Sequence, residues 1–223
     1  KAVVQISLPN YYGLSMKGYN QAHEHVSFND KLRALNEKQT YAYLDQKDTR
    51  LFYKLYFSVL DYVNALEQII PNKKIDPNNY IEPDELVNLI EVFWKAKDRF
   101  IDDYVQKNPL NLTYRNLNII KDFKYGMRKN FLLAVYEKNY TVLNDEGINY
   151  MVKGLNENLD KFIPAEKTPM LIQTAIMPFN GMIIYDGFIS TADMQLSQEL
   201  VSKAFEDYSY GQKIYSLLPK NMN

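Results

Sequence analysis

The stretch IMPFNGMIIYDGFIS, residues 176–190, is where the chain departs most clearly from a helical pattern. It contains the pairs Asn180-Gly181 and Asp186-Gly187, and such pairs tolerate the positive φ angles of two-residue hairpin turns. We therefore predict that residues 176–179 pair with residues 182–185, and that the second turn returns a short third strand. Since Pro178 has no N–H to donate, its strand is expected at an edge or at a bulge.

Most of the remaining sequence carries apolar residues at every third or fourth position, which is the spacing of a helix packed on a core. Pro83 suits the first turn of one such helix. Gly126 would lie inside another helix and allow a close helix crossing. The five apolar series are Leu51, Phe52, Leu55, Tyr56, Val59, Leu60 and Val63; Leu86, Leu89, Ile90, Phe93, Ile101 and Tyr104; Leu117, Ile120, Met127, Phe131, Ala134 and Val135; Ile148, Met151, Val152, Leu155 and Leu159; and Leu196, Leu200, Val201 and Phe205.

These patterns predict a mostly α (α+β) fold, in which residues 1–223 form a single domain. Its scaffold would be a multi-helix bundle with a small C-terminal β-hairpin or meander at residues 174–190. The apolar run from Val3 to Leu8 predicts an N-terminal strand that completes this small sheet. Residues 71–83 are rich in Pro, Asn and Lys, which indicates a hinge or a subdomain boundary.

Composition narrows the functional classes. The 26 basic and 27 acidic residues give a net charge of −1, so no global field attracts nucleic acid or an anionic membrane. The absence of cysteine excludes disulfides, cysteine-bound zinc and thiol nucleophiles. No apolar run reaches the ~18 residues that span a bilayer. We expect a cytoplasmic protein with no cofactor and no membrane partner, although the first residue, Lys1, leaves a removed signal peptide as an open alternative.

Two stretches carry a resemblance. The pattern PFxGxIxYDG, from Pro178 to Gly187, resembles a motif near the C-terminus of uncharacterised bacterial helical proteins. The stretch FYKLYFSVLDYVNA, residues 52–65, is similar to a helix in the same proteins. The resemblance implies a helical fold and a bacterial origin, and it brings no activity with it. Some of those proteins carry a short cysteine-containing metal motif that this chain lacks.

The hairpin supplies the first candidate site. An exposed edge formed by Pro178, Phe179, Tyr185 and Asp186 could bind a protein partner or a second copy of the chain. The 19 tyrosines favour the same interpretation, because tyrosine is common at protein interfaces. No nucleotide-binding or hydrolase motif occurs. We therefore expect a non-catalytic helical interaction or adaptor module.

A basic stretch supplies the second candidate, KDFKYGMRK at residues 121–129. On a helix, Lys121, Lys124 and Arg128 would share one face, with Tyr125 available to stack on a base. This face could contact a nucleic-acid backbone. Because basic helix faces are usually only solvated, nucleic-acid binding is an alternative to the adaptor interpretation and not the favoured one.

Histidines and aspartates supply the third candidate, a metal-dependent hydrolase. In an extended segment His23 and His25 would point to the same side and could share a metal ion. Asp98 and Asp102 would lie on one face of a helix. A polar loop and a solvated helix face explain the two sets better than a metal site does, since neither set has the further ligands that a metal site needs.

Overall fold

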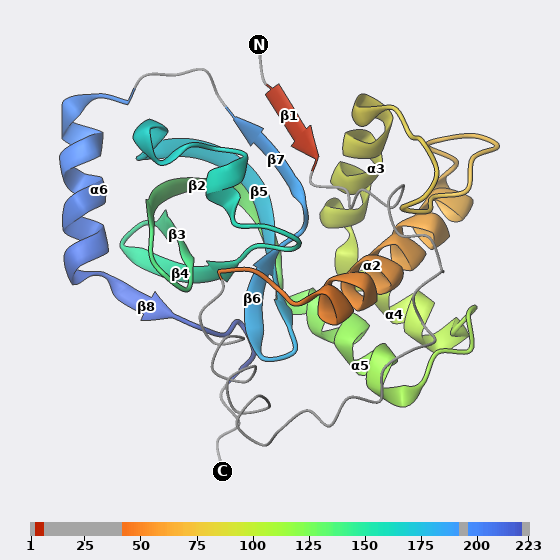
Figure 1. Cartoon of the computed structure of the whole chain (residues 1–223). Coiled ribbons are helices and arrows are strands. Elements are labelled where there is room, and N and C mark those ends of the chain that lie inside the picture. The colour runs from red at the N-terminus through yellow and green to blue at the C-terminus, as the bar shows by residue number, and fades with distance from the viewer. Residues whose placement is uncertain (1–2, 7–41, 192–195, 220–223) are drawn as a thin grey trace, which may run out of the picture.

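The computed structural model describes residues 3–6, 42–191 and 196–219. Its centre is a ring of five strands, β2 (Met127–Tyr136), β3 (Thr141–Asp145), β4 (Ile148–Lys153), β6 (Met182–Tyr185) and β5 (Met170–Phe179), in that order. The ring closes because β5 pairs with both β6 and β2. The predicted helical bundle with a small hairpin is therefore wrong, since a mixed sheet forms the main scaffold (Figure 1).

Within this ring β4 and β6 are parallel, and each of the other four neighbouring pairs is antiparallel. The order of the strands and their directions match those of a five-stranded OB-fold barrel, whose third and fifth strands are the parallel pair. The two-residue turn between β5 and β6 then corresponds to the last loop of that barrel. The link between β4 and β5 carries the 3-10 helices η3 (Leu159–Lys161) and η4 (Ala165–Lys167).

Three further strands extend the ring. β7 (Phe188–Thr191) pairs with β5, and β1 (Val3–Ile6) runs antiparallel to β7. The predicted N-terminal strand is thus confirmed over Val3–Ile6, although the sheet that it joins is much larger than expected. β8 (Gln212–Ile214) is parallel to β4 and pairs with residues 148–150.

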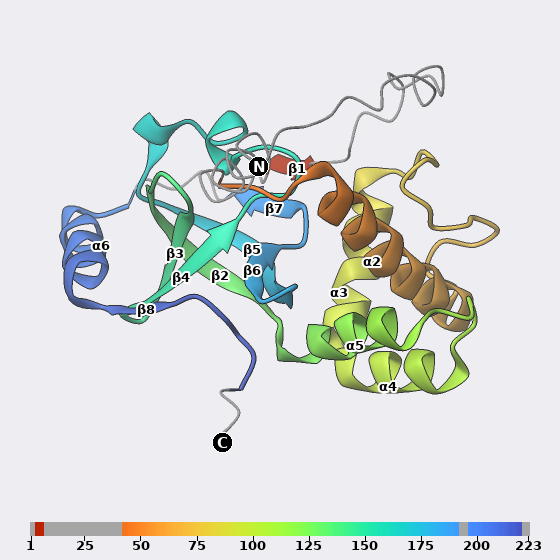
Figure 2. The same cartoon turned by 60° about the horizontal axis from the view of Figure 1, so that its bottom comes forward.

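Helices flank the barrel on two opposite sides (Figures 1 and 2). On one side lie α2 (Gln46–Glu67), α3 (Pro83–Lys95), α4 (Lys97–Lys107), α5 (Tyr114–Asp122) and the 3-10 helix η2 (Phe123–Tyr125). On the other side lies α6 (Gln198–Tyr210). The helices predicted from the first, second and last apolar series are confirmed, with Ala96 separating α3 from α4. Residues 68–82 connect α2 to α3 without helix or strand.

Residues 127–135 and 148–159 were predicted to lie in two helices, and this prediction is wrong because the first range forms β2 and the second forms β4 and the start of the link to β5. Both faces of β3 and β4 are buried. Leu143 and Val152 belong to the main core, whereas their neighbours Val142 and Met151 pack in a second cluster with Tyr208 of α6. A strand buried on both faces loses the alternation of polar and apolar residues that marks it in the sequence.

The first predicted turn is confirmed, and the second is not a hairpin turn. Asn180 and Gly181 have φ values of 48° and 79°, and β5 pairs with β6 across them in the predicted register. At Asp186-Gly187 the chain instead continues along β5, because β6 and β7 both pair with that strand. These two residues therefore form a bulge. Pro178 lies beyond the last residue of β5 that pairs with β2, where a missing N–H removes no ladder bond.

The helices and the barrel share one apolar core. At their junction the ring of Phe52 in α2 lies 5.4 Å from that of Tyr56 and 5.7 Å from that of Phe179 in β5. Phe123 of η2 lies 6.2 Å from Phe52 and 6.1 Å from Tyr56. All four rings are fully buried, so this aromatic cluster fixes α2 against the barrel.

Candidate functional site

A cavity of about 900 Å³ lies at one mouth of the barrel. Its walls come from the loop between β2 and β3, the end of β4, the start of β6 and the segment that leads into α2. Such a volume lies in the range of pockets that hold small ligands. The described lining residues are Tyr43, Leu44, Asp45, Gln46, Asp48, Thr49, Asn139, Tyr140, Lys153, Asn156 and Met182.

Backbone and side-chain bonds fix the segment that leads into α2 to the end of β4. The N–H of Leu44 donates to the carbonyl of Gly154 at 3.1 Å, and the N–H of Gly154 donates to the carbonyl of Ala42 at 2.6 Å. Asp45 caps α2 by accepting from the N–H of Asp48 at 2.8 Å. The cavity wall is therefore built before any ligand is present.

The turn between β5 and β6 is tied to the same wall. The side-chain amide of Asn180 donates to Asp48 Oδ1 at 3.2 Å. Thr49 Oγ1 lies 2.9 Å from the carbonyl oxygens of both Asp45 and Leu155. These contacts join three segments of the chain that are far apart in the sequence, and they set the shape of the mouth.

Among the described lining residues the cationic side chain is that of Lys153, and only 6% of the surface of this residue is exposed. Its Nζ lies 4.5 Å from the centre of the Tyr140 ring, whose edge meets Tyr215 at a centroid distance of 5.5 Å. Burial lowers the pKa of Lys153 and raises the pKa of Tyr140. The ammonium group of Lys153 therefore lies beside an aromatic face.

The sequence did not identify this lining as a site. Asn139, Tyr140, Lys153 and Asn156 fall in or beside the strands that were predicted to be helical. One signal was available, namely a lysine at the end of the apolar run INYMV, residues 148–152. A lysine there had either to leave the core or to face a cavity.

The second cluster of perturbed groups, around Asp186, is buried. This carboxylate is fully buried at the junction of helices and barrel, where it accepts from the N–H of Phe188 at 3.1 Å and from the hydroxyl of Tyr56 at 3.3 Å. Burial raises the pKa of Asp186 to about 6, although the positive charge of Arg128 opposes the rise. The cluster belongs to the packing of the helices on the barrel.

Arg128 is the cation of this buried cluster, and its side chain is only 4% exposed. Its Nε donates to Glu91 of α3 at 2.8 Å, while its Nη1 is buried without a hydrogen-bond partner. Trp94 Nε1 donates to the hydroxyl of Tyr56 at 3.3 Å. This arrangement connects α2 and α3 to the barrel through charge as well as through aromatic packing.

The predicted partner edge is not exposed. Pro178, Phe179, Tyr185 and Asp186 are all buried, because β5 and β6 face the helices across the shared core. The expectation that they form a docking edge is therefore corrected. At this hairpin the exposed residues are those of the turn, Asn180 and Gly181.

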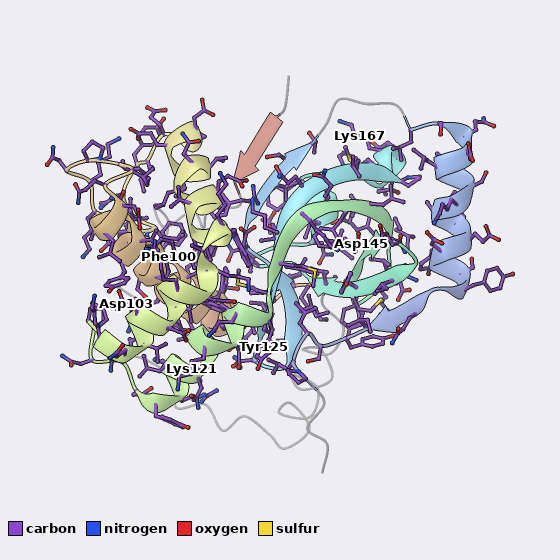
Figure 3. All side chains as sticks on the ribbon, turned by 180° about the vertical axis from the view of Figure 1, so that it is seen from behind. Phe100, Asp103, Lys121, Tyr125, Asp145 and Lys167 are labelled. Carbon is purple, nitrogen blue, oxygen red and sulfur yellow. The ribbon has the colours of Figure 1, made fainter. Side chains whose placement is uncertain are left out.

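The four residues of the predicted nucleic-acid face lie on three different elements, so no common helix face exists. Lys121 is in α5 and has its Nζ 5.9 Å from the centre of the Tyr114 ring, while Lys124 in η2 forms an ion pair with Asp102 at 2.8 Å. Arg128 is buried in β2. Figure 3 shows Lys121 among the helices and Tyr125 where the helices meet the barrel. Since Lys124 is ion-paired and Arg128 is buried, Lys121 is the one exposed cation of this face, and a single cation gives little attraction for a phosphate backbone.

The metal candidates do not come together either. His23 and His25 lie outside the described residues. Asp98 pairs with Lys97 at 2.9 Å and Asp102 pairs with Lys124. Among the residues that the structure describes, no three His, Cys, Asp or Glu side chains lie close enough to hold a metal ion.

Comparisons with protein-family models, with curated proteins and with solved structures give no match for this chain. In the part of the chain that the structure describes, none of the helices is both long and apolar enough to cross a membrane. Any function of the candidate site must therefore be inferred from the arrangement of its described residues.

Proposed function

We propose that the protein is a non-catalytic binding module whose barrel mouth receives a ligand. The observation that carries this proposal is the position of the 900 Å³ cavity. It lies between the loop after the first strand of the ring and the turn that leads into the last strand. These are the loops with which OB-fold barrels bind their ligands. The likeness is one of fold, so the residues of the lining must carry the rest of the argument.

The lining suits binding better than catalysis. The hydroxyl of Thr49 would be its aliphatic nucleophile, but both oxygens within 2.9 Å of it are backbone carbonyls and not a general base. Among the described lining residues, the remaining polar groups are amides, carboxylates, phenols and one ammonium group. They converge on one hollow with apolar contacts from Leu44 and Met182, which is the usual composition of a ligand pocket.

A pair of neighbouring variants tests the proposal. Asn156 lines the cavity, whereas Glu157 is exposed and is not part of the lining. Asn156→Trp should fill the mouth, and Glu157→Trp should leave it open. A thermal-shift screen of nucleotides, sugars, amino acids, short peptides and oligonucleotides should find compounds that stabilise the parent and the Glu157 variant but not the Asn156 variant. Stabilisation that survives in Asn156→Trp would place the ligand elsewhere and refute the proposal.

A further inference from the structure

A second cavity, of about 510 Å³, lies along α2 and shares no described lining residue with the cavity at the barrel mouth. Residues of α2 from Arg50 to Ala65 line it at three- and four-residue spacing, so they form one face of that helix. The other walls are residues 74–78, before α3, and residues 109–110, between α4 and α5. At 1.5 Å per residue the face on α2 is roughly 22 Å long, so this α2 cavity is elongated.

The carboxylates of the α2 cavity already hold one of its walls in place. Asp61 Oδ1 accepts from the N–H of Ile75 at 2.7 Å, which ties the segment before α3 to α2. Asp76 Oδ1 accepts from the N–H of Asn78 at 2.9 Å and from its side-chain amide at 2.7 Å. Both carboxylates therefore stabilise the wall itself.

The hydroxyl groups of the lining are bonded to the protein as well. Ser58 Oγ lies 2.8 Å from the hydroxyl oxygen of Tyr104. The hydroxyl of Tyr62 donates to Asp103 and accepts from Lys107 Nζ at 2.8 Å. A peptide backbone in this cavity would need hydrogen-bond partners, and these hydroxyl groups are already engaged. An apolar chain has no such need.

Three cations of the lining have no such partners. Within the described parts of the chain, no ion pair or hydrogen bond engages the charged groups of Arg50, Lys54 and Lys74, and all three residues are exposed. The neighbouring Lys73, by contrast, pairs with Glu85 at 2.7 Å. Arg50 and Lys54 are four residues apart in α2, a spacing at which like charges repel each other. A bound anion would remove this repulsion and accept hydrogen bonds from both side chains.

Apolar groups form much of the remaining surface. Leu110 is 56% exposed, and Ala65, Pro77 and Pro109 line the cavity with it. Alanine and proline lose no side-chain freedom when a ligand covers them. Covering these groups removes apolar surface from water, which favours the binding of an apolar chain.

We propose that the α2 cavity binds a linear alkyl carboxylate, which is a fatty acid in chemical class. The carboxylate would lie between Arg50 and Lys54, and the alkyl chain would cover Leu110, Pro77 and Ala65. The elongated shape favours a linear chain, and a volume of about 510 Å³ lies within the range of small-ligand pockets. This site is distinct from the barrel mouth and does not rest on the function proposed for it.

The first measurement is calorimetric titration of the full chain with decanoate, with 1-decanol and butyrate as comparisons. Decanol keeps the chain and lacks the charge, whereas butyrate keeps the charge on a short chain. We expect decanoate to bind at least about tenfold more tightly than either compound, because it alone uses the cations and the apolar wall together.

Two pairs of exposed positions supply matched variants. Lys54→Glu should raise the dissociation constant of decanoate about tenfold or more, since a charge-assisted hydrogen bond becomes a repulsion. Lys47→Glu makes the same charge change on α2 outside the described lining, and it should bind decanoate as the parent does. Leu110→Ser should weaken binding about fivefold, and Leu66→Ser, at a similarly exposed leucine outside the described lining, should not.

Several results would overturn the inference. These are no binding of decanoate by the parent, equal affinity for decanol, and an affinity that Lys54→Glu leaves unchanged or that Lys47→Glu lowers as much. A peptide of alternating aspartate and leucine that displaces decanoate and binds more tightly would show that the ligand is an acidic peptide instead. Decanoate binding that is lost in Asn156→Trp and kept in Lys54→Glu would place the anion in the barrel mouth.

Discussion

Asp186 gives the sharpest quantitative prediction, because its carboxyl group is fully buried and its pKa is raised from an ordinary value of 3.8 to about 6. Between these two values the folded chain binds more protons at this group than the unfolded chain does. The free energy of unfolding must therefore fall as the pH rises through this window. The full difference between the two pKa values corresponds to about 3 kcal/mol. Above pH 7 the free energy of unfolding is lower by this amount.

The replacement Asp186→Asn removes this titration while keeping the shape of the side chain. Urea unfolding of the parent and the variant should be followed from pH 4.5 to 8 at constant ionic strength, with the fluorescence of Trp94, the only tryptophan, as the signal. Subtracting the two profiles cancels the other titrating groups. We expect the parent to gain about 2 kcal/mol relative to the variant on going from pH 8 to pH 4.5.

The sign of that difference shows whether burial raises the pKa of Asp186. Parallel profiles would mean that the pKa of Asp186 is not raised. A parent that loses stability relative to the variant at low pH would mean that Arg128 lowers the pKa of Asp186 more than burial raises it. Either result would refute the account of the buried cluster.

Further replacements test the same interface and the hairpin by urea unfolding. Gly126→Ala places a Cβ 2.9 Å from a carbonyl oxygen of β5 and 2.9 Å from the Trp94 ring. It should therefore lower the free energy of unfolding by about 1–3 kcal/mol. An unchanged free energy of unfolding would show that the backbone does not approach these groups tightly. Gly181→Ala has open space but φ is +79°, so backbone strain alone should cost about 1–2 kcal/mol. Arg128→Met should cost about 3–5 kcal/mol at pH 8 and less at pH 5, where Asp186 is largely protonated; equal losses at the two pH values would contradict the pairing.

The features that the sequence predicted correctly depend on local chemistry. Asn180-Gly181 forms its turn because both residues adopt positive φ, and Pro83 begins α3 at the position where its missing N–H costs nothing. The stripe of α2, from Phe52 to Val63, is readable because only one face of that helix is buried. Periodicity and turn residues suffice for such elements.

The barrel was not predicted for three physical reasons. The strands β3 and β4 are buried on both faces. In β2, Phe131 followed by Ala134 and Val135 imitates helical spacing. The turn Glu146-Gly147, with φ of 48° and 84°, was hidden because Asn144 and Asp145 also suit a helix cap. Ring closure is a non-local event, since Val152 pairs with Ile183. The cavity depends on that closure, which is why its lining could not be assembled from the sequence.

The closure of the ring between β4 and β6 is the central claim, because it frames the mouth and its cavity. Nuclear Overhauser contacts in the isotope-labelled protein measure it directly. We predict backbone contacts between Val152 and Ile183 and between Lys153 and Ile184, in parallel register. Contacts that join β6 to β5 alone, with the edge of β4 unpaired at Val152 and Lys153, would show an open sheet and contradict the account.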